Sequence, residues 1–357
     1  MPTSSSSSSK LLREQPRLPW RITSSLAMGL TASLSRIFLY GLNSVQVTGL
    51  ERFLDILDKR KDVDKRQRGL ITVCNHISVL DDPLMWGVLP FGRAFHPSNH
   101  RWGLGAHDIC FKNNILSAFF SAGQVLPIHR LQHSPHGGLF QPATSQAIRL
   151  LSSHSFSSVV AGEGRIPGLP QVYAQNHCSW VHVFPEACVH QHPNMFMRYF
   201  KWGVSRMILE SEPMPDVLPI FIDGTQRIMP EDRGWPRGIP RVGVNFRVAF
   251  GELVNTEKVF GDLRVQWQEL VRQQQVTTQT PYVLGELSDE LKYGDAAVKL
   301  RIEVARRVRE EVLKVRGSLG YPDEEPPGFE LAETWKREPE KDKFRSGVDD
   351  SLVNKRQ

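Results

Sequence analysis

The sequence predicts an α/β domain over residues 49–322, and two kinds of signal support this. Short apolar runs rich in β-branched residues recur along the stretch, and the run from Leu70 to Cys74 is typical of a buried strand. A helix start follows it, because Asp82 can cap a helix whose first residue is Pro83. Strands followed by helices, repeated along the chain, indicate the α/β class.

The other predicted elements follow in chain order. A short helix from Leu50 leads into a charged loop before the first strand. Because Pro219 lacks an N–H, we expect its strand to be irregular or at a sheet edge. Further strands are predicted at Gln124 to Ile128, Trp180 to Phe184, Val217 to Ile222 and Val242 to Phe250, and helices at Asn114 to Ala122, Ala143 to Leu151 and Asp295 to Val315. The last helix has bases on one face and an apolar stripe on the other, formed by Val298, Ile302, Ala305, Val308 and Leu313.

Three segments are predicted to lack a fixed structure. Residues 1–23 form a basic tail with consecutive serines, residues 152–178 a flexible insertion rich in Ser, Gly and Pro, and residues 323–357 a charged tail. An Arg- and Ser-rich start with few acids also resembles a mitochondrial presequence. Composition leaves a disordered tail and a presequence as equal interpretations of residues 1–23.

Residues 24–48 are the membrane candidate. Leu26, Leu30 and Ile37 belong to one apolar stripe at helical spacing. Arg36 and several serines interrupt the stretch, whereas a membrane span requires about 18 apolar residues without charges. We therefore predict a helix that lies in the membrane interface. A surface helix packed on the domain is the alternative.

His76 and Asp81 are the candidate catalytic pair. They have four residues between them, so on one helix they would point about 140° apart. Across a corner between a strand and a helix the carboxylate can instead meet the imidazole. Such a contact fixes one ring nitrogen and leaves the other to accept a proton from a hydroxyl. On spacing alone, the alternative is a histidine in a turn and a second capping aspartate.

The composition indicates the kind of partner. A net charge of +6 favours an anionic surface such as membrane phospholipid. Nucleic acid is disfavoured, because the bases are not gathered with aromatic residues on one recognisable module. The four cysteines form no C-x-x-C and H-E-x-x-H is absent, so we expect no metal. The oligomeric state stays open.

The stretch from Asn75 to Pro83, N-H-I-S-V-L-D-D-P, resembles the first signature block of the glycerolipid acyltransferases, which contains an H-x-x-x-x-D dyad. The second block of that family is a glycine, an apolar strand and an arginine that holds phosphate, and Gly123 and Arg130 match it. The third block, F-P-E-G, is matched from Phe184 to Glu186.

This resemblance implies a mixed sheet flanked by helices, with the dyad at a helix N-terminus. It also implies that His76 takes the proton of an acceptor hydroxyl while Asp81 orients the imidazole. It implies no cofactor. Substrate-binding roles are expected for Gly123, Arg130, Pro185, Glu186 and Lys201.

Two features near the third block qualify these expectations. Ala187 stands where the family has glycine, and alanine makes a left-handed backbone conformation unfavourable there. The segment F-K-W-G-V-S-R supplies Lys201 and Arg206 as candidates for holding anionic headgroups.

Three further segments, D-D-P-L-M-W-G, H-D-I-C-F and F-K-W-G, resemble one branch of the family, whose members move acyl chains between phospholipids and lysophospholipids. The resemblance implies a CoA-independent transacylase that remodels cardiolipin from monolysocardiolipin and phosphatidylcholine. It implies attachment to one leaflet of the mitochondrial inner and outer membranes, facing the intermembrane space. An acyl-CoA-dependent lysophospholipid acyltransferase and a non-enzymatic lipid-binding membrane protein are the alternatives.

Overall fold

The computed structural model describes residues 18–97, 100–131, 133–153, 178–236, 238–279, 281–324, 327–332, 334, 343–345 and 352–354. Most of the predicted insertion and the first seventeen residues of the predicted N-terminal tail therefore lie outside the described residues.

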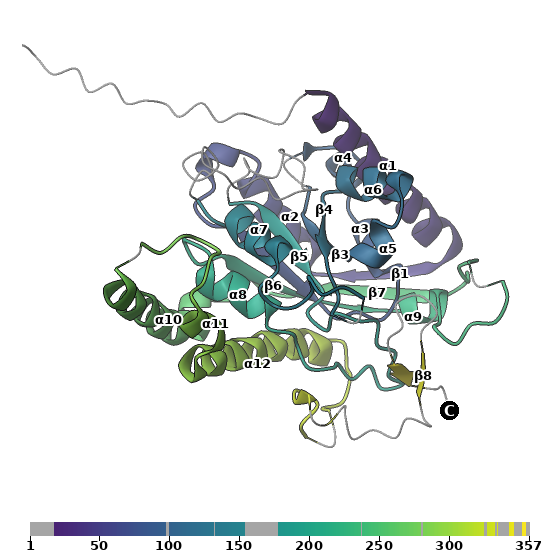
Figure 1. Cartoon of the computed structure of the whole chain (residues 1–357). Coiled ribbons are helices and arrows are strands. Elements are labelled where there is room, and N and C mark those ends of the chain that lie inside the picture. The colour runs from purple at the N-terminus through teal and green to yellow at the C-terminus, as the bar shows by residue number, and fades with distance from the viewer. Residues whose placement is uncertain are drawn as a thin grey trace, which may run out of the picture.

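A five-stranded mixed sheet forms the centre of the fold (Figure 1). Its order is β1 (Ser44–Thr48), β7 (Asn245–Phe250), β6 (Asp216–Asp223), β2 (Leu70–Cys74) and β5 (Trp180–Val183). Only the β6–β7 pair in this sheet is antiparallel. The predicted α/β fold with a mixed sheet is confirmed.

A second pair of parallel strands extends this sheet beyond β5. These strands are β3 (Gly103–Ala106) and β4 (Val125–Ile128). Trp102, just before β3, forms a parallel bridge with Val181 of β5. Because β6, β2, β5, β3 and β4 all run in one direction, their carboxyl ends meet at one edge. In open α/β sheets this is the edge where ligands bind.

Pro219 occupies a central strand, so the prediction of an edge or irregular strand was wrong. β6 lies between β2 and β7, and its register pairs Ile220 with Phe250. Pro219 is therefore opposite Gly251, one residue beyond the end of β7, and its carbonyl accepts the Gly251 N–H at 2.8 Å. The missing proline N–H faces Gly251, beyond the last pair of β6 and β7, so the proline removes only one bond at the end of this ladder.

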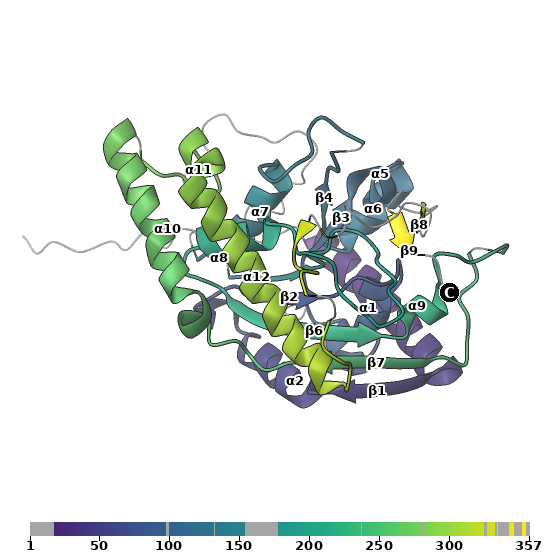
Figure 2. The ribbon, with the colours of Figure 1, turned by 90° about the horizontal axis from the view of Figure 1, so that it is seen from below.

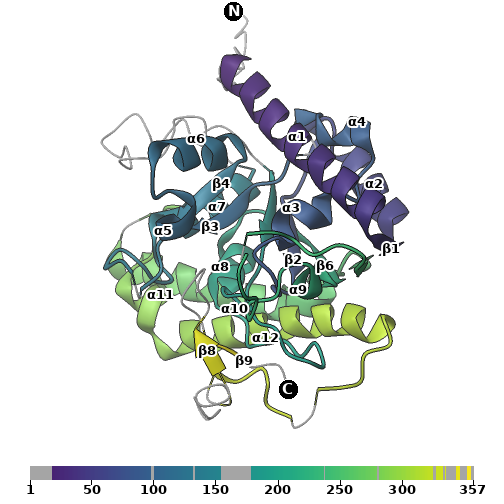
Figure 3. The same cartoon turned by 90° about the vertical axis from the view of Figure 1, so that its right-hand side faces the viewer.

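Helices cover both faces of the sheet (Figures 2 and 3). One face carries α8 (Gly203–Glu210), α10 (Thr256–Thr278), α11 (Asp289–Tyr293) and α12 (Asp295–Ser318), of which α12 runs across β6. The other carries α1 (Leu18–Leu42), α2 (Leu50–Lys59), α3 (Asp81–Trp86) and α4 (Phe91–Ala94). The remaining short elements are η1 (Val63–Lys65), α5 (His107–Cys110), α6 (Asn114–Ala122), α7 (Pro142–Leu151), α9 (Thr225–Ile228) and the pair β8 (Lys343–Arg345) and β9 (Leu352–Asn354).

The inner face of α12 differs from the predicted stripe. Ile302 is 47% exposed, whereas Arg301, Arg309 and Arg316 are buried. These arginines were expected on the solvent face, but their guanidinium groups bind backbone carbonyls, which offsets the cost of burial. Arg309 donates to the carbonyls of Met197 and Arg198 at 2.6 and 3.0 Å. As a result α12 fixes the chain around residues 194–198, which borders the site described below.

The start of the predicted C-terminal tail is packed on the domain. Glu324 pairs with buried Arg309 and accepts the Met197 N–H at 2.7 Å. The Phe329 ring lies 5.0 Å from that of Phe196. The prediction that disorder begins at residue 323 was therefore wrong for these residues.

Helix α1 begins earlier and ends earlier than the helix predicted over residues 24–48. It gives way to β1, because Ser44–Thr48 pairs with β7. Three of its four buried residues are small, Ser24, Gly29 and Ser35, and the fourth is Leu39. A Cβ added to Gly29 would lie 2.2 Å from the Phe95 ring. Arg36 donates to the carbonyls of Gly87, Val88 and Leu89 after α3. The leucine stripe faces outward and does not pack on the domain.

Candidate active site

The imidazole of His76 and the carboxylate of Asp81 meet at the carboxyl end of β2. Nδ1 of His76 lies 2.8 Å from Oδ2 of Asp81. The His76 side chain is 23% exposed and Asp81 is fully buried. The His76 ring stacks on Phe184, with centroids 4.5 Å apart. One ring nitrogen is thus held by a buried carboxylate, while the ring remains at the protein surface.

The corner between β2 and α3 brings the two residues together. Asn75 extends β2, because its side-chain amide exchanges two 2.9 Å hydrogen bonds with the backbone of Ile222 in β6. The chain then turns back, and Oδ2 of Asp81 accepts the N–H groups of Ile77 and Ser78 at 2.6 and 2.8 Å. Oδ1 accepts the hydroxyl of Thr225 at 2.5 Å.

Asp82 does not cap α3, contrary to the prediction. The helix begins at Asp81, with Leu80 at the N-cap position. Asp82 instead accepts Trp86 Nε1 at 3.0 Å and forms a two-point ion pair with Arg101. Burial raises the pKa of Asp82, but the charges of Arg101 and His182 and the hydrogen bonds from Trp86 and Arg101 together outweigh burial, so the pKa lies below its usual value. Asp82 therefore ties α3 to the chain before β3.

Glu186 is buried and holds two loops by their backbones. Its Oε1 accepts the His76 N–H at 2.9 Å and its Oε2 accepts the Arg198 N–H at 2.8 Å. Burial raises its pKa to about 7, although these two N–H donors act in the opposite direction. The carboxylate thus fixes the position of the His76 backbone.

The turn after β5 contains the expected Pro185 and an unexpected backbone conformation. The Pro185 carbonyl accepts the Lys201 N–H at 2.7 Å, which places the start of the Lys201 segment beside the third block. Lys201 is exposed and its Nζ lies 2.8 Å from the Tyr199 hydroxyl. Ala187 has φ 57°, so the backbone adopts the left-handed region there although alanine was expected to disfavour it. The turn imposes this conformation, since the Ala187 N–H bonds the Phe184 carbonyl at 3.0 Å.

Arg130 follows β4 at the same edge of the sheet as His76. Three strand spacings separate β4 from β2, which corresponds to about 14 Å between strand axes. Arg130 forms a two-point ion pair with Asp108, which lowers the pKa of that carboxyl below its usual value. Gly123 lies at the other end of β4, after α6, with an ordinary φ of −74°. The structure does not bring Gly123 to the dyad.

Arg206 is not available to bind a headgroup, contrary to the prediction. It is buried in α8 and pairs with Glu210 through bonds of 2.5 and 2.7 Å. No helix was predicted over these residues; on a helix, the four-residue spacing of Arg206 and Glu210 is a usable signal for this pair. Within the described residues, no cluster of His, Cys, Asp and Glu side chains is arranged to hold a metal ion.

Comparison with known proteins identifies the class. The family model described as Acyltransferase matches residues 44–223, half of the chain, and includes the dyad, Arg130 and Glu186. The chain therefore belongs to the acyltransferase family, and the expectation of an acyltransferase is confirmed.

Similar proteins narrow the assignment to one branch of the acyltransferase family. A tafazzin from Saccharomyces cerevisiae is 36% identical over 335 residues, which cover 89% of this chain and 84% of that protein. A tafazzin from Dictyostelium discoideum is 33% identical over 226 residues, covering 62% of this chain and 66% of its own. An N-acylphosphatidylethanolamine synthase from Arabidopsis thaliana is 35% identical over 185 residues, covering 51% and 55%. Within the acyltransferases, the chain belongs with the tafazzins.

Proposed function

We propose that this acyltransferase moves acyl chains between phospholipids and lysophospholipids, and that it remakes cardiolipin from monolysocardiolipin. The 2.8 Å contact between His76 and Asp81, at the edge where the parallel strands end, carries the proposal, because it is the arrangement of a general base. The tafazzin relatives and the branch-specific segments support the choice of lipid.

The proposed reaction needs no group beyond the protein and two lipids. Asp81 holds Nδ1–H of His76, so Nε2 takes the proton from the hydroxyl of the lysophospholipid. The oxygen attacks the ester carbonyl of the donor phospholipid, and a tetrahedral intermediate forms. Its collapse breaks the donor ester, and His76 returns the proton to the departing lysophospholipid. One ester replaces another, so the exchange is close to equilibrium.

We propose that some of the expected substrate-binding residues contact lipid directly and that others act through neighbouring residues. Arg130 is suited to phosphate because its guanidinium fork donates parallel hydrogen bonds, as it now does to Asp108. Lys201 is an exposed cation on the segment next to Pro185, and we assign it to an anionic headgroup. Glu186 acts through His76, because both of its oxygens already bind backbone N–H groups. Gly123 serves only by starting the strand that carries Arg130.

A membrane surface is proposed on the side of α1. By length and composition this 25-residue helix suffices to cross a membrane. We propose that it lies in the interface instead, because Arg36 binds the backbone after α3 and the small-residue face of α1 packs on the domain. The outward face is apolar, and α4 and α6 beside it extend the apolar surface. The exposed residues are Leu18, Ile22, Leu26, Leu30, Leu34, Ile37, Phe91, Ile115 and Phe119.

This placement predicts a protein bound to one leaflet, and we propose the mitochondrial inner and outer membranes, on the side of the intermembrane space. Attachment keeps donor and acceptor lipids at high local concentration beside the dyad.

A second acceptor is favoured by one observation, the similarity to the N-acylphosphatidylethanolamine synthase. An amine would then replace the hydroxyl as the group that His76 deprotonates, and the product would be an amide.

The experiment offers both acceptors at once. Purified full-length protein is added to liposomes that contain acyl-labelled phosphatidylcholine, monolysocardiolipin and phosphatidylethanolamine. Label in cardiolipin is expected. Label that accumulates only in an alkali-resistant amide would replace the proposal with N-acylation. Lipid binding without any transfer would favour a non-enzymatic protein.

A further inference from the structure

The carboxylate of Asp81 is held from two separate parts of the chain. Oδ2 receives His76 and the two N–H groups of the corner after β2. Oδ1 receives the hydroxyl of Thr225, which is 144 residues away in sequence and fully buried. At 2.5 Å, the Thr225–Asp81 contact has the length of a hydrogen bond to an ionised carboxylate.

Thr225 is the first residue of α9, and only Gly224 separates it from the end of β6. Gly224 makes the turn with φ 112°, and a Cβ there would lie 2.6 Å from the Asn245 carbonyl, so the turn requires glycine. The Gly224 N–H also donates to the Gln226 side chain at 2.7 Å. The position of the Thr225 hydroxyl is thus set by a strand end and a rigid turn.

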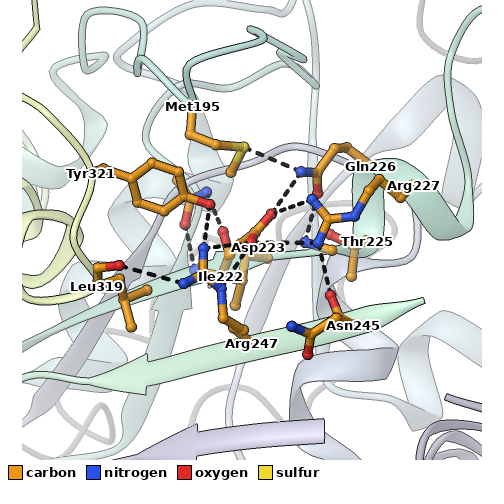
Figure 4. A network of polar contacts seen from close by, with 12 residues as sticks. Met195, Ile222, Asp223, Thr225, Gln226, Arg227, Asn245, Arg247, Leu319 and Tyr321 are labelled. Atoms are coloured by element: carbon orange, nitrogen blue, oxygen red, sulfur yellow. Dashed lines mark hydrogen bonds and ion pairs between the residues drawn. The ribbon is translucent and has the colours of Figure 1, made fainter. Parts of the chain in front are cut away.

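A polar network around Asp223 anchors this turn (Figure 4). Asp223 accepts hydrogen bonds from Gln226 Nε2 at 2.7 Å, from Arg227 Nη1 at 3.0 Å and from two donors of Arg247 at 2.8 and 3.0 Å. Arg247 also donates to the Tyr321 hydroxyl at 2.6 Å. Burial raises the pKa of Asp223, but these donors and charges outweigh it, so the pKa lies below the usual value and the carboxylate stays ionised. The network ties α9 to β7 and to the end of α12.

We infer that Thr225 is a positioning residue for the dyad. Rotation about the Cβ–Cγ bond of Asp81 moves both carboxylate oxygens together, so the Thr225 bond to Oδ1 adds to the restraint that the Ile77 and Ser78 N–H groups place on Oδ2. With Oδ1 held by Thr225, Oδ2 is directed at Nδ1 of His76, and His76 presents Nε2 to the acceptor hydroxyl. This inference rests on the proposed function, since it concerns the rate of the same acyl transfer.

The test removes the Thr225 hydroxyl and asks whether the resulting change in kcat requires the Asp81 carboxylate. Thr225→Val is the closest in shape, and Thr225→Ala is the second variant because it cannot crowd Oδ1. Both are expected to lower kcat about 10- to 100-fold with KM within about twofold, which is the size of a lost hydrogen bond to a charged group. Thr225→Ser keeps the hydroxyl and is expected to restore kcat to within about threefold of wild type.

Two controls separate positioning from simple loss of stability. Ser205→Ala removes another buried hydroxyl, on α8, which donates to the Arg301 carbonyl of α12 at 2.7 Å. This change should lower thermal stability without lowering kcat. In an Asp81→Asn background, Thr225→Ala should lower kcat by less than about twofold, because the carboxylate it orients is gone.

The outcomes are distinct. Wild-type kcat in both Thr225→Val and Thr225→Ala would overturn the inference, and so would an undiminished effect of Thr225→Ala in the Asp81→Asn background. Absence of transfer by the wild-type protein would instead count against the proposed function itself.

Discussion

At the scale of single residues, the chemistry depends on how His76 is held. Asp81 binds Nδ1, Phe184 covers one ring face and Glu186 holds the backbone N–H. None of these three contacts uses Nε2, which is the nitrogen that the mechanism requires.

Loss of either member of the dyad should therefore abolish or nearly abolish transfer. His76→Ala removes the base, and Asp81→Asn should lower kcat by roughly three to four orders of magnitude, because the imidazole loses its orientation. Initial rates in liposomes, with thermal unfolding to verify the fold, measure both effects.

Asp82→Asn is the matched control for Asp81→Asn. It should lower stability by about 1–3 kcal/mol, because the Arg101 guanidinium, which is 9% exposed, loses its charged partner. Its kcat should stay far above that of Asp81→Asn. Equal loss of kcat in the two variants would contradict a specific role for Asp81.

The raised pKa of Glu186 predicts an unusual pH dependence of stability. Between about pH 4.5 and 7 the folded state holds a proton on Glu186 that the unfolded state has released. The free energy of unfolding that Glu186 contributes should therefore fall as pH rises through this window, by about 3 kcal/mol in total.

Glu186→Gln cannot ionise and should lack this slope. Denaturant unfolding of both proteins from pH 4.5 to 8 measures the difference between them. Parallel curves across the window would show that the carboxyl has an ordinary pKa.

At the scale of elements, the two faces of α1 have different roles: one packs on the domain, and the other is proposed to bind lipid. Its small residues face the domain, and Leu26 and Leu30 on the other face are 49% and 56% exposed. Leu26→Glu with Leu30→Glu should weaken binding to anionic liposomes about tenfold or more without lowering the melting temperature. Co-sedimentation and thermal unfolding measure the two effects.

Gly29→Leu is the complementary change on the buried face. It should lower the melting temperature, because any Cβ at this position overlaps the Phe95 ring. If Leu26→Glu with Leu30→Glu destabilised the fold and left liposome binding intact, the outward face would be a packing surface.

Elements with strong local signals could be predicted from the sequence. Helix α6 has its predicted bounds, because Asn113 caps its start and Gly123 ends it. Helix α10 was not predicted, although Phe260, Leu263 and Trp267 are buried at helical spacing. The polar residues around them hide this pattern. Pro219 misled the prediction because strand order decides whether a missing N–H matters, and strand order is a property of the whole sheet.

At the scale of the whole molecule, the site combines one local motif with several distant partners. The dyad lies within six residues, so its spacing and the resemblance sufficed to predict that the two side chains meet. The partners of the dyad and of Arg130 lie outside these local motifs: Thr225 bonds Asp81, Glu186 bonds the His76 N–H, and Asp108 pairs with Arg130. These pairs meet because the carboxyl ends of β6, β2, β5 and β4 share an edge, and no spacing along the chain encodes that.

An assay that identifies the acyl donor tests the proposed transacylase function most directly. Purified protein is added to liposomes with labelled phosphatidylcholine and monolysocardiolipin, and no CoA or acyl-CoA is present. Because an ester exchange between two lipids needs no activated donor, labelled cardiolipin should form with an equal amount of lysophosphatidylcholine, and His76→Ala should form neither. Label transfer that occurs only when acyl-CoA is supplied would contradict the account and identify a CoA-dependent acyltransferase.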